Sequence, residues 1–331
     1  MSSQITDTKQ FNEDRYLDST LRPCSFNEYI GQEKIKDNLR ILIEAANKRK
    51  EAIDHILLSG SSGLGKTTLA HIIAKEMNSN IKITSGPAIE KVGDLASILT
   101  NLQPGDILFV DEIHRLNKTI EETLYPAMED FVLDIVIGKG PSARTVRLEL
   151  PQFTIVGATT RFGLLSGPFR DRFGLIHRLS YYKPQALADI IIKGAKKLNV
   201  KIDQKSALEI GRRSRGTPRI ALKLLKRVRD YVQVNKSGQI SPTEVHNALK
   251  MLAIDTKGLD ETDRRLLKKI IVLHKGGPVG LSTMAATLLE DPGTIEEVIE
   301  PYLLQIGFLK RTPQGRVVTE AAYQYLGRKY P

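Results

Sequence analysis

The stretch from Gly60 to Thr67, which reads GSSGLGKT, constrains this chain more than any other feature of its sequence. It fits the pattern GxxxxGK followed by Ser or Thr at every position, between the apolar run HILLS and the helical pattern TTLAHIIAKEM. Glycines in such a loop let backbone N–H groups wrap a phosphate, a lysine adds positive charge, and the next hydroxyl reaches Mg²⁺. A tight turn with a surface lysine is the alternative interpretation, but the flanking strand and helix patterns favour a phosphate-binding loop.

Three further short runs of strand character follow, at residues 81–84, 106–110 and 153–160, and helical patterns separate them. Short, largely apolar strands of this kind are typical of a parallel sheet that helices cover on both faces. We therefore predict an α/β domain over residues 21–182. Residues 1–20 are polar and are predicted to form a disordered tail.

Two smaller domains are predicted after the sheet. Residues 183–255 contain no convincing strand, and Thr217-Pro218 and Ser241-Pro242 mark helix starts, so this block is predicted to be a small helical bundle. Residues 256–331 combine helical patterns with the segments FLKRT and RVVT around a Pro-Gln-Gly turn. Helices followed by a hairpin indicate a winged-helix domain.

The composition is that of an ordinary globular protein. Of its 331 residues 41% are hydrophobic and 26% charged, and no stretch approaches the ~18 consecutive apolar residues of a membrane helix. The N-terminal residues lack the apolar core of a secretory signal. The only cysteine, Cys24, can form no internal disulfide, which agrees with a reducing compartment. We expect a cytoplasmic protein with no membrane partner.

The net charge of +11 is concentrated in the middle block, where 16 lysines and arginines stand against 6 acidic residues over 183–255. Residues 1–182 carry 22 basic and 23 acidic side chains, and residues 256–331 carry 11 and 9. Such a basic block suits either a solvated helical face or an anionic partner. Charge alone does not decide between them.

The run ILFVDEIH supplies the acids that a hydrolytic site needs. Its four apolar residues predict a buried strand, which presents Asp111 to hold Mg²⁺ through water and Glu112 to polarise the attacking water. Two acids that cap the next helix are the alternative. His114 invites comparison with a helicase box, but an ordinary polar histidine after the strand is favoured.

Four residues farther along the chain are candidates for sensing or stabilising the reacting phosphate. Thr160 ends the strand VGATT, where it either contacts the terminal phosphate or is simply a β-branched strand end. Arg170 and Arg172 lie in the turn-rich segment GPFRDRFG, too far along to return to their own phosphates, so we expect an arginine offered to a neighbouring subunit. Surface ion-pair partners are the alternative interpretation of the two arginines. Arg219 falls in the first turn of a helix, where it is placed to close over the nucleotide.

These signatures, in this order, resemble those of the AAA+ ATPases. Within them the chain is similar to the RuvB family, whose hexameric rings drive branch migration of Holliday junctions. The likeness runs from about Leu21 to Leu326 and rests on LRPCSFNEYIGQE, NIKITSGPAIEK, LFVDEIHRLN, LYPAMEDF, DIVIGKGPSAR, RSRGTPRIA, GLDETDRRLL and EPYLLQIGFLKRTPQGR.

The resemblance implies a role for each matching residue, with ATP and Mg²⁺ as cofactors. Arg172 would be an arginine finger that acts on the nucleotide of a neighbouring subunit. Thr160 would be sensor 1 and Arg219 sensor 2, while Asp111 and Glu112 complete the hydrolytic site. The implied nucleotide and Mg²⁺ contacts also include Leu21, Arg22, Gly63, Gly65, Lys66, Thr67, Thr68, Glu129, Asp130, Phe131 and Tyr182, with Thr67 and Asp111 on the metal.

The chain departs from the family pattern in its phosphate loop, where Ser61 and Ser62 replace two usual prolines, and in its finger segment, which reads SGPFRDRFG. Because proline fixes φ near −65°, the serines are expected to loosen the loop. We expect nucleotide binding to survive this change, with affinity at risk.

Residues 131–150 are predicted to form a β-hairpin, because Leu133, Ile135 and Ile137 alternate with Asp134 on one strand. A second strand continues the alternation with apolar side chains at 146, 148 and 150. The apolar face must be covered, either by the hairpin's own domain or by a partner. In the resembled family that partner is RuvA, which recognises the junction.

The winged-helix domain offers two ways to meet DNA. If TIEEVIEPYL entered a major groove, Glu296, Glu297 and Glu300 would face phosphates and be repelled. The hairpin instead carries Lys310, Arg311 and Arg316, which suit backbone or minor-groove contacts that ignore sequence. A wing that merely caps the domain is the alternative.

The expected function is therefore that of a DNA-dependent ATPase in a homohexameric ring around duplex DNA. In the family, rings flank RuvA on a four-way junction during recombination and repair, with RuvC as a functional partner. A protein-remodelling AAA+ machine would instead need apolar or aromatic pore residues, and no convincing pore loop is visible. A clamp-loader-like switch would bind DNA and hydrolyse ATP without moving junctions.

Overall fold

The computed structural model describes residues 20–137, 144–235 and 238–330. Residues 1–19 of the predicted N-terminal tail and the centre of the motif IGKGPSAR lie outside these residues, whereas Thr20, the last residue of that tail, is helical. The chain divides into two compact units. Of the described residues, the sheet unit comprises those in Arg22–Gly60 and Leu64–Ser180, and the lid-and-wing unit comprises Thr20, Leu21, Ser61–Gly63 and those from Tyr181 to Tyr330. Each is described by itself.

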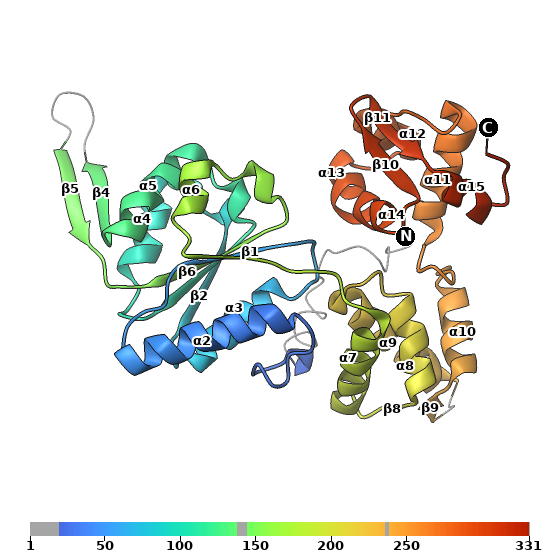
Figure 1. The fold of residues 1–331 in the computed structure, drawn as a ribbon, viewed down its shortest axis with the longest axis horizontal. Helices are drawn as coiled ribbons and strands as arrows, with labels where there is room; N and C mark the ends of the chain where they lie inside the picture. The colour runs from blue at the N-terminus through green and yellow to red at the C-terminus, as the bar shows by residue number, and fades with distance from the viewer. Residues whose placement is uncertain (1–19, 138–143, 236–237, 331) are drawn as a thin grey trace. The chain divides into compact units, whose positions relative to one another are not determined.

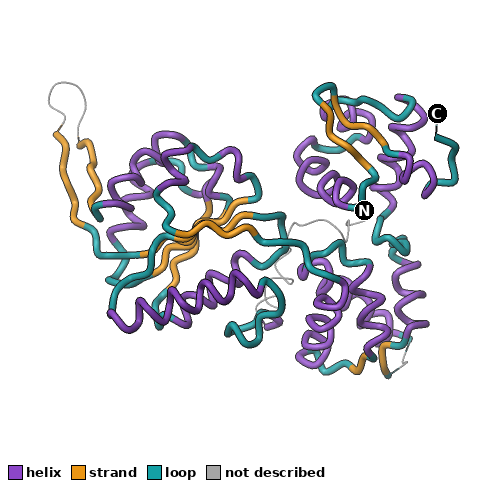
Figure 2. Tube along the Cα trace, in the orientation of Figure 1, coloured by secondary structure: helices purple, strands orange, loops and turns teal. Residues whose placement is uncertain are grey.

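The sheet unit contains the predicted parallel sheet, with five strands in the order β2-β3-β6-β1-β7. Figure 1 shows α2 and α3 on one face of this sheet and α4, α5 and α6 on the other, and Figure 2 shows the strands in orange between purple helices. The elements are β1 (Ile56–Ser59), β2 (Ile81–Ser85), β3 (Ile107–Asp111), β6 (Thr154–Thr159), β7 (Leu175–Arg178), α2 (Glu33–Arg49), α3 (Lys66–Glu76), α4 (Val92–Thr100), α5 (Lys118–Glu129) and α6 (Gly167–Asp171).

Burial explains why these runs form strands. Every residue of β1 and β6 is buried, so each strand loses water on both faces, as the continuous apolar runs predict. Full burial of one large apolar side chain stabilises the fold by about 1.5–3 kcal/mol. Sequence analysis did not predict β7, which lies at the edge of the sheet. Its residues are not all buried: Ile176 is 44% exposed, whereas the next residue, His177, is buried.

The predicted hairpin is present as β4 (Val132–Ile137) and β5 (Arg144–Glu149), which pair antiparallel. Leu133 and Leu150 are buried in the core of the sheet unit, so the base of the hairpin packs on its own domain. Farther out, Val146 is 37% exposed and Asp134 pairs with Arg147 at 2.8 Å. The base of the hairpin is therefore covered by its own domain, as one of the two alternatives predicted, and the covering of its outer part by a partner stays a prediction.

The lid-and-wing unit begins with the predicted helical bundle. Ser241 caps its helix as predicted, with its hydroxyl accepting from the N–H of Glu244, whereas Thr217 makes no side-chain cap. The expectation of no strand is wrong in detail, because two short parallel strands join in the bundle. The elements are α7 (Pro184–Lys197), β8 (Lys201–Ile202), α8 (Gln204–Arg212), α9 (Pro218–Val234), β9 (Gln239–Ile240) and α10 (Pro242–Met251).

The winged-helix prediction is also confirmed. The wing is an antiparallel pair in which Arg311 lies opposite Arg316, and one continuous helical stretch with a π-helical turn precedes it. The elements are α11 (Glu261–His274), α12 (Leu281–Leu288), α13 (Pro292–Thr294), η5 (Ile295–Ile299), α14 (Glu300–Gln305), β10 (Leu309–Thr312), β11 (Gly315–Val318) and α15 (Glu320–Tyr325).

A buried ion pair ties α11 to the loop before α9. Arg215, which is 4% exposed, donates to the carboxylate of Asp263 and to the carbonyl of Gly258, the latter at 2.9 Å. Burial raises the pKa of Asp263 to about 7 although the Arg215 guanidinium favours the charged form. The loop that precedes α9, the helix that carries Arg219, is thus bonded directly to the first turn of α11 in the winged-helix domain. No described helix has the length and apolar character needed to cross a membrane.

Candidate functional site

The phosphate loop connects the C-terminal end of β1 to the N-terminus of α3, as its motif requires. Gly60, Gly63 and Gly65 have φ values of 144°, 80° and 102°, conformations that other residues rarely adopt. A Cβ at Gly65 would lie 2.7 Å from the Tyr29 hydroxyl, so this position also lacks room for a side chain. The backbone is therefore shaped as an anion-binding loop at a helix N-terminus.

Lys66, Thr67 and Thr68 form the first turn of α3. Lys66 is 8% exposed, and its Nζ donates to the carbonyl oxygen of Gly60 at 2.7 Å, so the ammonium group spans the loop. The two threonines are half-buried. This placement fits a cation and a hydroxyl that face a bound phosphate and its metal.

Asp111 and Glu112 lie at the C-terminal end of β3, on the same edge of the parallel sheet as the end of β1. The N–H of Glu112 donates to Asp111 Oδ1 at 2.9 Å. Glu112 has a φ of 48°, an uncommon conformation that is typical of constrained functional residues. Its carboxylate pairs with Arg115 at 2.9 Å, a contact that sequence reasoning missed. Catalysis by Glu112 would require this carboxylate to turn toward water.

Thr160 follows the last residue of β6 and is exposed, at the same edge of the sheet. Its neighbour Thr159 is buried, with its hydroxyl 3.0 Å from Nδ1 of His114 and accepting from the N–H of Arg161. Burial lowers the pKa of His114, which therefore favours the neutral imidazole. His114 links the ends of β3 and β6, a structural role in line with its interpretation as an ordinary histidine.

Arg172 contacts its own subunit through three groups. Nη1 donates to the carbonyl of Pro168 at 2.6 Å, Nη2 donates to Glu129 at 3.2 Å, and the guanidinium lies 4.0 Å from the ring centroid of Tyr125. The segment was predicted to be turn-rich, whereas α6 occupies Gly167–Asp171 with a cap from Ser166. No sequence pattern indicated the pairing with Glu129, because the partners are 43 residues apart.

This arginine lies at the edge of the sheet opposite the phosphate loop. The carbonyl of Met128 contacts His55 at 3.1 Å, immediately before β1 begins, while the phosphate loop follows the end of β1. Gly174, two residues after Arg172, packs against Asp54. The adjacent segment Glu129-Asp130-Phe131 shares this edge. None of these residues therefore lines the phosphate loop of its own subunit.

Two predicted residues of the lid-and-wing unit, Arg219 and Tyr182, belong to the surroundings of Ser61 and Ser62. Arg219 Nη1 donates to the Ser62 hydroxyl at 2.9 Å, and the Ser61 hydroxyl lies 2.6 Å from that of Tyr181. Each serine hydroxyl has a partner that proline cannot bind, whereas the expected loosening of the loop stays a prediction. Tyr182, the next residue, is buried and donates its N–H to the carbonyl of Gly216 at 2.9 Å.

Two predicted residues flank the start of the sheet unit. Leu21 is buried, 6% exposed, and its side chain lies near Gly194 of α7 in the lid-and-wing unit. Arg22 belongs to the sheet unit, where burial and the charge of Arg22 together lower the pKa of His71 in α3. Arg22 is therefore near the helix that begins at the phosphate loop.

The wing carries the predicted DNA-binding residues. Lys310 is exposed, and the side chains of Arg311 and Arg316 are 51% and 16% exposed. The sequence argument against major-groove docking counted Glu300 among the outward-facing glutamates, and this placement is wrong, because the residue is fully buried and binds both arginines. Glu296 and Glu297 remain at least partly exposed on the preceding turn.

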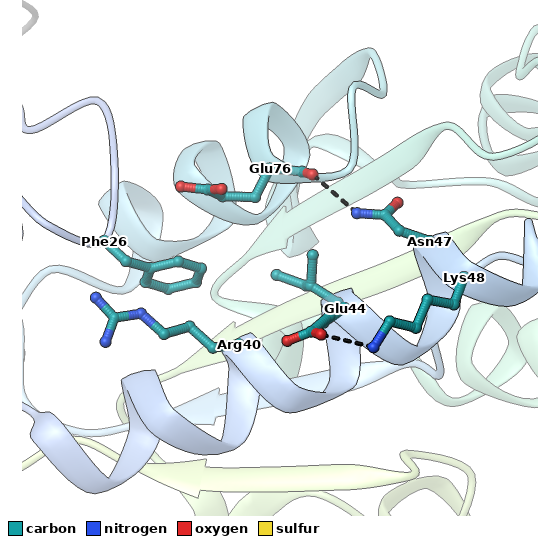
Figure 3. A pocket seen from close by; sticks show the side chains of 7 residues that line it. Phe26, Arg40, Glu44, Asn47, Lys48 and Glu76 are labelled. Carbon is teal, nitrogen blue, oxygen red and sulfur yellow. Dashed lines mark hydrogen bonds and ion pairs between the residues drawn. The ribbon is translucent and has the colours of Figure 1, made fainter.

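A groove beside α2 shares no residue with the phosphate loop (Figure 3). Its polar groups largely satisfy one another: Lys48 pairs with Glu44 at 2.7 Å, and the Asn47 amide donates to the carbonyl of Glu76 at 3.3 Å. The Arg40 guanidinium lies 5.8 Å from the ring centroid of Phe26. None of the residues predicted to bind or hydrolyse the nucleotide lines this groove.

A metal held by protein side chains alone would need a larger cluster than this edge offers. Within the described ranges, no group of three or more His, Cys, Asp or Glu side chains is arranged to hold a metal ion. The hydroxyl of Thr67 and the carboxylate of Asp111 are oxygen ligands of the kind that Mg²⁺ accepts together with water and phosphate oxygens. The donor set thus fits a metal that arrives with a nucleotide.

Comparison with known protein families matches three consecutive parts of the chain. Residues 21–179 match the Holliday junction DNA helicase RuvB P-loop domain, residues 182–255 the RuvB AAA lid domain, and residues 256–327 the RuvB C-terminal winged helix domain.

Individual relatives agree with these matches. The Holliday junction branch migration complex subunit RuvB of Chloroflexus aggregans is 58% identical over 320 residues, covering 97% of this chain and 91% of that protein. The solved Thermotoga maritima RuvB Holliday junction branch migration motor is 52% identical, with a TM-score of 0.86 over 94% of this chain and all of that one. A mutant of the same Thermotoga maritima RuvB superposes with a TM-score of 0.88 at 52% identity, covering 94% and 99% of the two chains.

Proposed function

This chain belongs to the RuvB family, and on that premise we propose that it is an ATP-driven motor that moves Holliday junctions along duplex DNA. The observation that carries the proposal is the split of the hydrolytic machinery between opposite edges of one sheet. Asp111 and Glu112 share the edge of the phosphate loop, and Arg172 lies at the other. Such a site is complete only where two copies meet.

Each residue on the phosphate-loop edge has a role that follows from its chemistry. Lys66 and the N–H groups at the start of α3 bind the β and γ phosphates of ATP. Thr67 and Asp111 hold Mg²⁺, which supplies positive charge to the phosphates. Glu112 polarises the attacking water once its carboxylate leaves Arg115. Thr160 contacts the terminal phosphate or orients that water.

The opposite edge supplies the second half of a neighbour's site. Arg172 stabilises charge on the phosphoryl group of the adjacent subunit, and the segment Glu129-Asp130-Phe131 lies beside the same nucleotide. An interface of this head-to-tail kind generates a ring when its rotation closes. We propose a homohexamer, as the family resemblance implies, in which Leu21, Arg22, Tyr182 and Arg219 complete each nucleotide site.

The wing is proposed to hold DNA. Lys310, Arg311 and Arg316 present positive charge on one hairpin, which suits phosphate contacts that carry no sequence information. A grip of this kind lets a motor advance along any duplex or arm of a four-way junction. Hydrolysis moves the wing through the lid, to which Arg215 and Asp263 attach it.

The hairpin is proposed to dock RuvA, with the exposed side chain of Val146 on the docking face. RuvC, recombinational DNA repair and a cytoplasmic setting follow from the resemblance alone. The protein-remodelling and clamp-loader alternatives are not favoured, since all three matching families are RuvB domains.

The proposal is tested by measuring ATP turnover with and without duplex DNA. We expect duplex to stimulate turnover and Lys66→Ala to abolish it, because the substitution removes the charge beside the phosphates while leaving the strand and helix intact. Turnover that duplex leaves unchanged, or that persists in Lys66→Ala, contradicts the proposal.

A further inference from the structure

A carboxylate lies buried beneath the two arginines of the wing. Glu300 begins α14, and its side chain is fully buried. Arg311 donates from Nε and Nη2 to the two oxygens of Glu300 at 2.8 and 2.9 Å. Arg316, directly opposite on β11, donates in the same way at 2.9 and 3.0 Å. Two guanidinium groups thus bind one carboxylate as paired forks.

These contacts use the full hydrogen-bonding capacity of the carboxylate but only part of that of each arginine. An ionised carboxylate offers about four acceptor positions, and the four hydrogen bonds occupy them. A guanidinium has five N–H groups, so each arginine has about three that do not bind Glu300. One amino group of Arg311 also lies 3.8 Å from the carboxylate of Glu296, but the Arg311 side chain remains 51% exposed and can therefore meet a phosphate. Glu300 and its two arginines together carry one net positive charge, which Glu296 partly offsets.

A purely structural role explains the cluster poorly. A buried ion network costs desolvation energy, and apolar residues of similar volume often stabilise a fold equally well or better. Burial by itself raises the pKa of Glu300, but the hydrogen bonds and positive charges of Arg311 and Arg316 together lower it, which keeps the carboxylate charged. What apolar residues could not supply is a fixed orientation of the two arginines, because a bidentate pair with a carboxylate fixes the plane of each guanidinium.

We infer that Glu300 is a positioning residue, which aims Arg311 and Arg316 at the phosphates of duplex DNA. The inference rests on the proposed role of the wing in DNA binding. The inference predicts the opposite change in DNA affinity from net charge alone. If only net charge mattered, removing the charge of Glu300 would make the wing more positive and strengthen DNA binding. If Glu300 positions the two arginines, removing its charge weakens DNA binding.

The first experiment replaces the carboxylate with its amide in the full-length chain. Glu300→Gln should weaken binding to a labelled duplex on the order of tenfold, as expected for the loss of a well-placed charged contact. The matched control is Glu297→Gln, which removes the same charge from an exposed position one turn earlier and should leave binding unchanged or slightly stronger. Equal or stronger binding by Glu300→Gln overturns the inference.

Two further measurements separate positioning from a loss of folding. Glu300→Asp keeps the charge but shortens the reach by one methylene, so it should also weaken binding while the thermal midpoint shows a folded protein. In a double-mutant cycle, Arg311→Ala should cost much less affinity in the Glu300→Gln background than in the wild type. Lys310→Ala, on the same strand, should cost the same in both backgrounds.

The outcomes also distinguish this inference from the proposed function. If Arg311→Ala and Arg316→Ala leave DNA binding unchanged, the wing has lost its proposed role and the inference falls with it. If both weaken binding while Glu300→Asp and Glu300→Gln bind as the wild type does, only the positioning role is refuted.

Discussion

The placement of Arg172 makes a strong prediction about how subunits share their sites. The four residues of β1 separate the start of the strand, near Arg172, from the phosphate loop at its end. At ~3.3 Å per residue the strand alone spans roughly 13 Å. An arginine side chain that is also bonded to Glu129 and Pro168 does not cross that distance. Arg172 must therefore act on another subunit or on no nucleotide at all.

The perturbation is Arg172→Ala, measured as ATP turnover in the presence of duplex DNA. Loss of an arginine finger lowers the rate by about 10³–10⁵, or about 4–7 kcal/mol of transition-state stabilisation. The matched control is Arg170→Ala on the same short helix, where the guanidinium lies 5.2 Å from the Phe162 ring centroid. This control should retain turnover.

Complementation then tests action in trans. Glu112→Gln subunits keep the finger but lack the base, and Arg172→Ala subunits keep the base but lack the finger. In a randomly mixed ring at equal amounts, about one quarter of the interfaces combine an intact base with an intact finger. Turnover should recover to about that fraction of the wild-type rate. Co-assembled rings whose turnover is only the sum of the two inactive variants would show that Arg172 does not act on a neighbouring subunit.

Three other predictions concern the lid, the junction to the wing and the hairpin. Ser62→Ala removes the hydrogen bond to Arg219, whose net contribution is roughly 1 kcal/mol of binding free energy. The substitution should therefore raise the KM for ATP about three- to tenfold with little change in kcat. An unchanged KM would show that this contact has no role in ATP binding. Arg215→Met leaves Asp263 buried without its cation and should cost about 3–5 kcal/mol of unfolding free energy at pH 8. Because the pKa of Asp263 is raised to about 7, protonation relieves part of this cost at lower pH, so denaturant curves with an equal loss at pH 6 and pH 8 would contradict the assignment. Val146→Asp should weaken RuvA binding in a pull-down titration while ATP turnover without RuvA stays normal, and unaltered RuvA binding would remove Val146 from the docking face.

Much of the fold could be predicted because its signals are local. The strands β1, β3 and β6 are largely apolar runs, and the phosphate loop carries its own pattern of glycines. By contrast, β7 contains His177 and Arg178 and lies at the sheet edge, where a strand need not be apolar throughout. The sequence therefore offered little contrast with a loop at that position.

The candidate site was predictable as residues but not as contacts. Motif spacing identified Lys66, Glu112 and Arg219, yet the Arg219 contact with Ser62 joins positions 157 apart. Glu300 was misplaced for a related reason. Helical spacing grouped it with outward-facing glutamates, whereas the wing folds back and buries it against two arginines. Sequence periodicity describes one element at a time and cannot show what another element brings to it.

If the proposed function is right, ATP hydrolysis by this chain moves a DNA junction. Strand separation of a synthetic four-way junction supplied with RuvA, this protein and ATP measures that movement. We expect duplex products that require ATP and fail to form with Lys66→Ala. Steady ATP consumption on a junction that stays intact, with RuvA bound, would contradict the proposed function.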